Sequence, residues 1–164
     1  MTRTSAGEAL TDLVLDLFRL SNRLTAAGDR LVSGLGLTSA RWQILGNMIA
    51  AGRAQPVAWL ARDMGGSRQN IQRIMNELEK EGLVTFKSNP HHRRAHLVEL
   101  TEQGRKVFAA AMDLQAPWAN DLANGLTVDE IAITRKVIVA LHARLASVEG
   151  EAEKDRGPSR RADH

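Results

Sequence analysis

The sequence predicts a mainly α-helical protein with one small β-hairpin. Three observations predict this fold class. Apolar residues recur every three or four positions along several stretches, aromatic residues make up only 4% of the chain, and two short β-prone runs, 83–88 and 95–100, flank a polar tip. At 164 residues the chain is long enough to bury about two-thirds of the surface that its unfolded form exposes. We therefore expect one domain or a compact pair of subdomains.

The composition suits a nucleic-acid partner without proving one. The formal net charge is +3 and the sequence pI is about 9.8, which is modestly basic. The absence of cysteine excludes disulfides and thiolate metal sites. In the N-terminal stretch the apolar residues are interrupted by Glu8, Asp12, Asp16 and Arg19, unlike a signal peptide or a membrane span. We expect a cytoplasmic protein with no membrane partner.

A long helix is expected at the N-terminus. Ser5 followed by Glu8 matches a capping box, and Gly34 with Gly36 supplies a stop. Between them a leucine-rich stripe keeps helical spacing at Leu10, Leu13, Val14, Leu17, Leu20, Leu24 and Leu31. A terminal helix of about seven turns is often an oligomerisation element.

Two shorter helices are expected next. Thr38 is a plausible N-cap for a helix that Gly52 ends. Pro56 suits the start of a third helix, residues 57–64, which a pair of glycines closes.

The segment 67–81, SRQNIQRIMNELEKE, has one apolar face and one polar face. At helical period the apolar stripe holds Ile71, Ile74, Met75 and Leu78, and the side chains off it include Arg68, Gln69, Asn70, Gln72, Arg73 and Asn76. Arginine suits guanine edges and phosphates, and asparagine or glutamine suits adenine edges. We interpret this segment as a DNA-reading helix capped by Ser67. The acids at 77, 79 and 81 would repel phosphates, so only residues 67–73 are expected to enter the groove.

Two helices joined by a glycine-containing turn and followed by a β-hairpin are typical of a winged helix-turn-helix. The hairpin tip, NPHHRR at 89–94, is basic and suits a minor groove or the DNA backbone. His91, His92 and His96 invite a metal hypothesis, but their spacing and the lack of a cysteine or acid within the run argue against it. We predict no metal and no cofactor.

Two further helices are expected after the hairpin. Thr101 opens the first, which Pro117 must kink or break because proline lacks an N–H. Thr127 and Glu130 form a capping box that starts the last helix. Residues 150–164 are charged and punctuated by glycine and proline, which predicts a disordered tail.

These motifs together resemble the multiple antibiotic resistance regulator (MarR) family of winged helix-turn-helix transcriptional regulators. The matching pieces follow the family's order at 37–45, 57–84, 89–94 and 98–105. The resemblance implies a homodimer that binds double-stranded DNA at a pseudo-palindromic operator and is usually a repressor released by a small, often aromatic or phenolic, effector. It also implies a DNA-binding domain at 37–100 and a helical dimerisation region formed by 1–36 and 101–149, with interlocking terminal helices.

The resemblance also implies which residues contact DNA. Its recognition positions hold Ser67, Arg68, Gln69, Asn70 and Arg73, and its wing-tip arginine corresponds to Arg94. With the neighbouring donors Gln72 and Arg93 these residues make the predicted DNA-binding set. The wing departs from the family's usual D-P-x-D-R-R, because Asn89 and His92 stand where acids are usual. This departure removes the usual partners of the two arginines.

Five apolar side chains are candidates for lining an effector pocket between the dimerisation helices and the DNA-binding lobe. They are Phe18, Trp42, Met48, Met112 and Trp118. Core packing is the alternative role for each. Trp59 lies off the apolar stripe of its helix, where the family more often has a polar residue, and no role is predicted for it.

Two other classes of function compete with DNA binding. A winged helix can serve as a protein–protein interaction module without a ligand response, but the polar face at 67–73 holds no hydrophobic anchor. No phosphate loop, nucleophile elbow or cluster of carboxylates with histidine indicates an enzyme.

Overall fold

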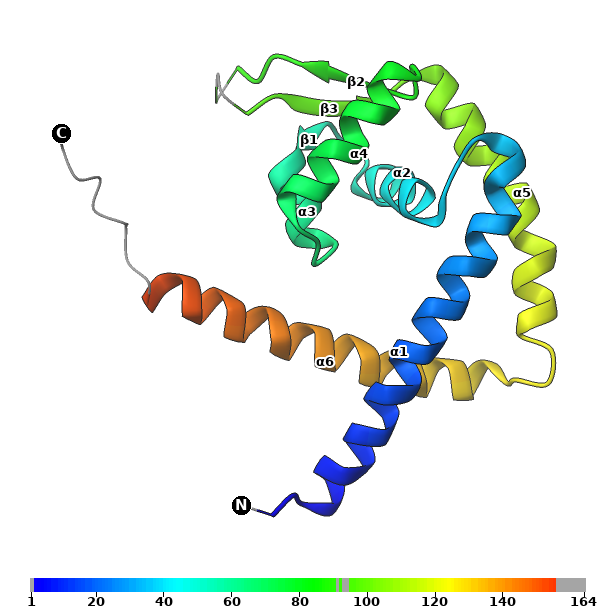
Figure 1. Cartoon of the computed structure of the whole chain (residues 1–164), viewed down its shortest axis with the longest axis vertical. Helices are drawn as coiled ribbons and strands as arrows, with labels where there is room; N and C mark the ends of the chain where they lie inside the picture. The colour runs from blue at the N-terminus through cyan, green and yellow to red at the C-terminus, as the bar shows by residue number, and fades with distance from the viewer. Residues whose placement is uncertain (1, 91, 93–94, 156–164) are drawn as a thin grey trace. The chain divides into compact units, whose positions relative to one another are not determined.

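The computed structural model describes residues 2–90, 92 and 95–155 (Figure 1). The chain divides into two compact units between Trp118 and Ala119. The helices are α1 (Ser5–Val32), α2 (Ser39–Ala51), α3 (Val57–Asp63), α4 (Arg68–Lys80), α5 (Glu102–Leu122) and α6 (Val128–Asp155), with a short 3-10 turn, η1 (Ser33–Leu35), after α1. The strands are β1 (Gln55–Pro56), β2 (Val84–Lys87) and β3 (Leu97–Leu100). The predicted fold class, mainly helical with a small antiparallel hairpin, is confirmed.

The first helix begins at Ser5, the residue predicted to cap it, and its cap is Thr4. Thr4 has an extended backbone and its hydroxyl accepts a hydrogen bond from the N–H of Gly7 at 3.1 Å. Ser5 is already helical, so the predicted capping box at Ser5 is wrong. The predicted caps at Thr38 and Ser67 are confirmed, because each hydroxyl accepts a hydrogen bond from the N–H three residues along.

The sheet has one strand that the sequence does not predict. Its order is β1-β3-β2, and all neighbours are antiparallel. The expected hairpin pairs Val84 with Leu100 at its base and Lys87 with Leu97 toward its tip. β1 adds Gln55 and Pro56 against β3. Two residues are too few to show alternation, and proline is tolerated on an edge strand because it need not donate to the ladder.

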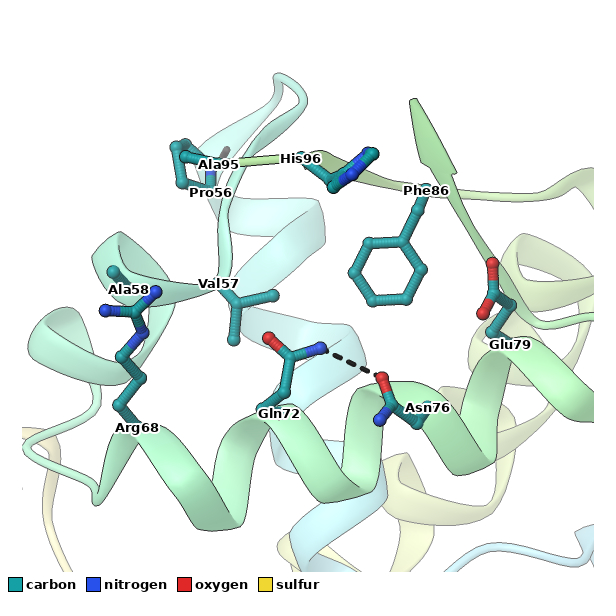
Figure 2. Close-up of a pocket in the computed structure, with 10 residues that line it drawn as sticks. All are labelled: Pro56, Val57, Ala58, Arg68, Gln72, Asn76, Glu79, Phe86, Ala95 and His96. Carbon is teal, nitrogen blue, oxygen red and sulfur yellow. Dashed lines mark hydrogen bonds between the residues drawn. The ribbon is translucent and has the colours of Figure 1, made fainter. Parts of the chain in front are cut away.

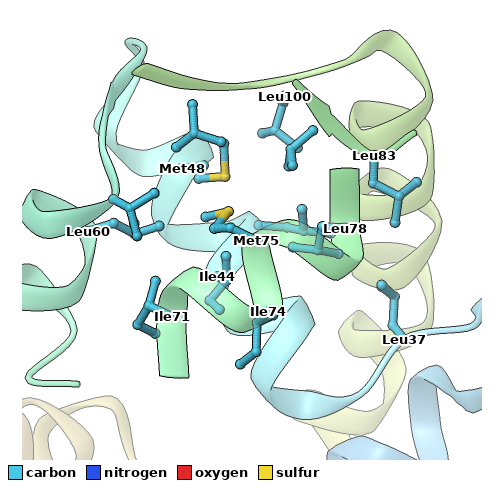
Figure 3. Packing of buried hydrophobic residues seen from close by; sticks show 14 of the residues in the cluster. Leu37, Ile44, Met48, Leu60, Ile71, Ile74, Met75, Leu78, Leu83 and Leu100 are labelled. Carbon is cyan, nitrogen blue, oxygen red and sulfur yellow. The ribbon is translucent and has the colours of Figure 1, made fainter. Parts of the chain in front are cut away.

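The core lies between α4, the helices α2 and α3, and the sheet (Figure 3). The predicted stripe of α4 is buried at Ile71, Ile74, Met75 and Leu78. These side chains pack with others from α2, α3 and the hairpin, among them Ile44, Leu45, Leu60, Val84 and Val98. Burial of the stripe turns the opposite face of α4 outward.

Ser39 joins the start of α2 to α1. Its N–H donates to the Asp29 carboxylate at 2.6 Å, and its hydroxyl donates to the carbonyl of Thr25 at 2.7 Å. A Cβ on Gly28 would lie 2.4 Å from the Ser39 hydroxyl oxygen. Glycine at this position therefore permits the close approach of the two helices.

The start of α5 lies close to Leu83, the residue that precedes β2. The Thr101 hydroxyl donates to the carbonyl of Gly82 at 2.6 Å and accepts from the N–H of Gly104 at 3.0 Å. A Cβ on Gly104 would lie 2.0 Å from the carbonyl oxygen of Leu83. Farther along, α5 continues through Pro117 to Leu122, so this proline does not break the helix, and the alternative of a kink stays a prediction.

α6 belongs to the second unit and has the predicted capping box. The Glu130 carboxylate accepts the N–H of Thr127 at 2.8 Å, and the Thr127 hydroxyl accepts the N–H of Glu130 at 3.2 Å. These bonds from Thr127 hold the pKa of Glu130 below its ordinary value.

Part of the segment predicted as a disordered tail, from residue 150, is helical in the structure. α6 continues to Asp155, because glutamate, alanine and lysine in the run EAEK are strong helix formers. The predicted tail at 156–164 lies outside the described residues.

Within the described part of the chain, no helix is both long and apolar enough to cross a bilayer.

Candidate nucleic-acid interface

The first two turns of α4 present a polar surface. Ser67, Arg68, Gln69, Asn70 and Arg73 are exposed, and Gln72 is half-buried. The chain folds this way locally because Ser67 caps the helix and burial of the apolar stripe in the core leaves the polar face outside. The six residues predicted on α4 are thus brought together on one outward surface.

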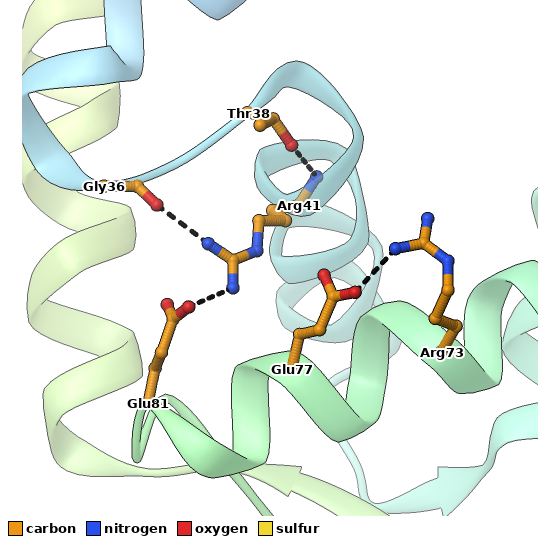
Figure 4. Close-up of polar contacts among 6 residues, drawn as sticks. All are labelled: Gly36, Thr38, Arg41, Arg73, Glu77 and Glu81. Atoms are coloured by element: carbon orange, nitrogen blue, oxygen red, sulfur yellow. Dashed lines mark hydrogen bonds and ion pairs between the residues drawn. The ribbon is translucent and has the colours of Figure 1, made fainter.

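Three of these six side chains, Asn70, Gln72 and Arg73, are hydrogen-bonded to other side chains along the helix. Arg73 donates to the Glu77 carboxylate at 2.6 Å (Figure 4). It also donates to the Asn70 amide oxygen at 3.0 Å. Gln72 donates to Asn76 at 2.9 Å (Figure 2). Such i, i+3 and i, i+4 bonds hold the donors at set positions on the helix surface. Arg68 and Gln69 have no hydrogen-bond or ion-pair partner among the described residues and are available to a ligand.

Two of the acids near the C-terminal end of α4 are paired with arginines. Glu77 pairs with Arg73, and Glu81 pairs with Arg41 of α2 (Figure 4). The Arg41 side chain is only 13% exposed and also donates to the carbonyl of Gly36 at 2.9 Å. These pairs partly neutralise the negative charge that the sequence places at this end of the helix. From the sequence, these acids are the reason to expect only residues 67–73 in the groove. Because two of the three acids are paired, their repulsion of phosphates is weaker than the sequence suggests.

A cavity of about 340 Å³ separates α4 from the wing (Figure 2). Arg68, Gln72 and Asn76 line it from α4. Phe86 of β2 and His96 line the opposite side. α4 and the wing therefore form two edges of one concave surface.

The wing is held by an ion pair across its strands. Lys87 of β2 pairs with Glu99 of β3. The hydrogen bond and the positive charge of Lys87 lower the pKa of Glu99.

The predicted wing contacts Arg93 and Arg94 lie outside the described residues, as does His91. Among the described residues no group of three potential metal ligands comes together.

The five predicted effector residues are not gathered around one described cavity. Met48 is buried in the core and lines a small cavity of about 90 Å³ beside β3. Trp42 and Trp118 are half-buried, whereas Phe18 is 65% exposed and Met112 is 38% exposed.

Trp59, for which the sequence predicts no role, lies at the edge of a larger cavity. The indole is 43% exposed, and the guanidinium carbon of Arg53 lies 5.5 Å from its ring centroid. Both residues line a cavity of about 730 Å³ that Arg68 also lines. The sequence signal for this site is a large aromatic residue on the polar side of a helix.

The three-helix core, the outward polar face of α4 and the β2–β3 hairpin define a winged helix-turn-helix protein. Residues 35–95 match the family model described as the MarR family. An uncharacterized protein of Mycobacterium tuberculosis is 36% identical over 140 residues, which are 83% of this chain and 96% of the relative. The transcriptional activatory protein BadR of Rhodopseudomonas palustris is 32% identical over 62% of this chain and 59% of its own length.

Solved structures agree with this assignment. A MarR family transcription regulator has a TM-score of 0.72 and 26% identity, over 88% of this chain and 95% of that one. The MarR protein of E. coli, in a mutant form complexed with operator DNA, has a TM-score of 0.67 and 24% identity over 80% and 97%. An organohalide-sensing regulator bound to 2,4-dichlorophenol has a TM-score of 0.75 and 17% identity over 90% and 89%. The chain belongs to the MarR family and is a DNA-binding transcriptional regulator, not an enzyme.

Proposed function

We propose that this regulator is a homodimeric repressor that binds a pseudo-palindromic operator and is released by a small ligand. The observation that carries the proposal is the exposed start of α4, where Arg68 and Gln69 have no partner among the described residues. The residues proposed to read the major groove are Ser67, Arg68, Gln69, Asn70, Gln72 and Arg73. Arg93 and Arg94 are proposed to contact DNA from the wing.

Exposed apolar side chains on the terminal helices support the dimer. On α1 the exposed residues include Leu15, Phe18 and Leu20, and on α6 they include Ile133 and Leu145. Among its described side chains α6 has no fully buried residue. Stripes of this kind are usually buried against another chain. We accordingly propose that residues 1–36 and 101–149 form the dimerisation region and residues 37–100 the DNA-binding domain.

Binding of a small ligand is supported by one solved structure of similar fold. The organohalide-sensing regulator of similar fold binds a chlorinated phenol. The five effector residues expected from the sequence remain a prediction for this chain.

Selection of bound sequences from random oligonucleotides tests DNA reading and the dimer together. We expect a pseudo-palindrome whose half-site centres are about one helical turn, roughly 10 bp, apart. A reporter gene behind the recovered site should become more active when the regulator is deleted. Recovery of unpaired half-sites would contradict the dimeric mode, and lower reporter activity on deletion would contradict repression.

Substitution of Arg73 tests the proposed base contact. Arg73→Ala should weaken binding to the selected site by about 1–3 kcal/mol, because a bidentate contact to a base is lost. Gel-shift titration measures the change. Lys106→Ala, which removes an equally exposed cation from α5, is the control and should leave affinity within about twofold. Equal affinities for the Arg73 variant and the control would contradict the role of Arg73.

A further inference from the structure

One arginine of α2 lies where the turn after α1 meets the end of α4. The Arg41 guanidinium donates to the carbonyl of Gly36, in that turn, at 2.9 Å. It also donates to the carboxylate of Glu81, the residue that ends α4. Figure 4 shows the guanidinium between these two acceptors. A single side chain therefore joins two segments that are far apart in the sequence.

The surroundings of Arg41 favour one fixed geometry for this link. Its side chain is largely buried, and its Nε atom has no hydrogen-bond partner among the described residues. The guanidinium therefore depends on Gly36 and Glu81 for its side-chain hydrogen bonds. Because a guanidinium is planar and presents its N–H groups in a rigid fork, it holds two acceptors at a set separation. Loss of the carboxylate would leave a largely buried charge poorly compensated.

A second contact ties the end of α4 to α5. The Thr101 hydroxyl donates to the carbonyl of Gly82, the residue directly after Glu81, at 2.6 Å. At the other end of α4, the side-chain hydrogen bonds of residues 67–73 stay within the helix among the described residues. Polar links between α4 and the helices that flank the DNA-binding part are thus found at its C-terminal end.

The length of α4 makes its first turns sensitive to the position of this end. The helix has 13 residues, so it is about 20 Å long, and a tilt of about 5° at its end would move the first turn by about 2 Å. Contacts to base edges require their donors to be placed much more accurately than this.

We propose that Arg41 is a positioning residue for DNA reading, which fixes the direction of α4 by joining Glu81 to the turn after α1. Because its guanidinium is largely buried and already bonded, it acts through the position of α4 and not by contact with a phosphate. In a dimer, two α4 helices are held in this way, and their separation sets the half-site spacing that the protein accepts. This last step rests on the proposed function.

The absence of cysteine allows the link to be measured directly in the full-length protein. Spin labels are attached at Arg30→Cys, near the end of α1, and at Gln69→Cys, in the first turn of α4, both of which are exposed positions. Labelled chains are mixed with an excess of unlabelled chains, so that pulsed electron paramagnetic resonance reports the distance within one chain. We expect one narrow distribution that broadens or shifts in Arg41→Gln and in Glu81→Gln. An unchanged distribution in both variants would overturn the proposal.

Matched controls separate the link from general effects of charge. Glu79→Gln removes the same charge from an acid of α4 that has no bond to Arg41, and Lys106→Gln breaks an ion pair within α5. Both should leave the distribution unchanged. Arg41→Gln combined with Glu81→Gln should change it no more than Arg41→Gln alone, because the two residues act as one unit. Equal broadening in the controls, or additive effects in the double variant, would overturn the proposal. If Arg41→Gln does not fold, Glu81→Gln decides, because it breaks the same bond from the more exposed partner.

Operators with altered spacing connect the link to DNA reading. Gel shifts measure affinity for the selected site and for versions with a base pair inserted or removed between the half-sites. Wild-type protein should prefer the selected spacing, and Arg41→Gln and Glu81→Gln should each lower that preference by at least about threefold. Glu79→Gln should keep it. A variant that only loses stability binds every site less well by the same factor, so its preference does not change.

The two experiments fail in distinguishable ways. Full retention of the spacing preference in both Arg41→Gln and Glu81→Gln would overturn the role of Arg41 in DNA reading. A wild-type protein without any spacing preference would contradict the proposed dimeric operator binding alone, since the distance measurement decides the link without DNA.

Discussion

Arg73 is held in place by two neighbours on its own helix. Its guanidinium lies between the Asn70 amide and the Glu77 carboxylate, at 3.0 and 2.6 Å. The pair with Glu77 is largely exposed, so its contribution to stability is small, in the range of about 0–1 kcal/mol. Its greater effect is on geometry, because a guanidinium held by two bonds samples fewer positions when it meets a base edge.

Glu77→Gln should therefore change selectivity more than affinity. Loss of the negative charge should strengthen binding to unrelated DNA, while the freer Arg73 should lower the ratio of specific to unrelated affinity by about two- to fivefold. Gel shifts on the selected site and on a scrambled duplex measure both quantities. Glu79→Gln removes the same charge from an acid that has no bond to Arg73 and should keep the ratio. An equal ratio in both variants would show that Glu77 does not position Arg73.

The ion pair between Lys87 and Glu99 makes the wing sensitive to acid. The pKa of Glu99 is lowered in the folded protein by Lys87, so the unfolded state binds more protons as the pH falls. The stabilising effect is present above the ordinary glutamate pKa and is lost as the pH falls through the lowered value. Carboxyl ¹³C shifts should show a lowered midpoint for Glu99 that moves back toward the ordinary value in Lys87→Gln. An unmoved midpoint would exclude Lys87 as the main cause.

At the scale of whole elements, two glycines set how closely helices approach their neighbours. Gly28 permits contact between α1 and Ser39 of α2, and Gly104 permits contact between α5 and the Leu83 carbonyl. Both contacts join a helix of the proposed dimerisation region to the DNA-binding part of the chain. Their geometry therefore affects the position of α4, although neither residue belongs to the surface that we propose reads DNA.

Gly104→Ala should destabilise the protein by about 1–3 kcal/mol or more, because its Cβ would meet a backbone carbonyl that cannot rotate away. Urea denaturation followed by circular dichroism measures the loss. Gly34→Ala is the matched control, since a Cβ there meets nothing within 4 Å and glycine is costly in a helical turn. Equal midpoints for wild type and Gly104→Ala would mean that α5 can shift without cost.

For the molecule as a whole, both α1 and α6 carry exposed large apolar side chains. Leu145 is 66% exposed in the single chain, which is costly for leucine unless a second chain covers it. Leu145→Glu should shift the proposed dimer toward monomers in sedimentation experiments and weaken binding to a two-half-site operator. Arg3→Glu, a charge change before α1, should leave both measurements unchanged. An intact dimer in Leu145→Glu would show that this part of α6 lies outside the interface.

Local sequence signals determined most of the helices. Caps, glycine stops and apolar spacing act within a few residues, so they can be interpreted without knowing the fold. This explains why Thr38, Ser67 and the buried stripe of α4 agree with the structure. It also explains the error at Thr4, because Thr4 and Ser5 both carry a capping hydroxyl and only the backbone shows which one lies outside the helix.

The sequence by itself determined the fold class, the family and the polar face of α4. Only the tertiary structure decided the third strand, the pairing of Glu81 with Arg41, the close contacts at Gly28 and Gly104, and the cavity that joins Arg53, Trp59 and Arg68. The physical reason is the distance along the chain over which each kind of interaction acts. Periodicity and caps depend on neighbours within a turn, whereas strand pairs, ion pairs and cavities depend on segments that come together only when the chain has folded.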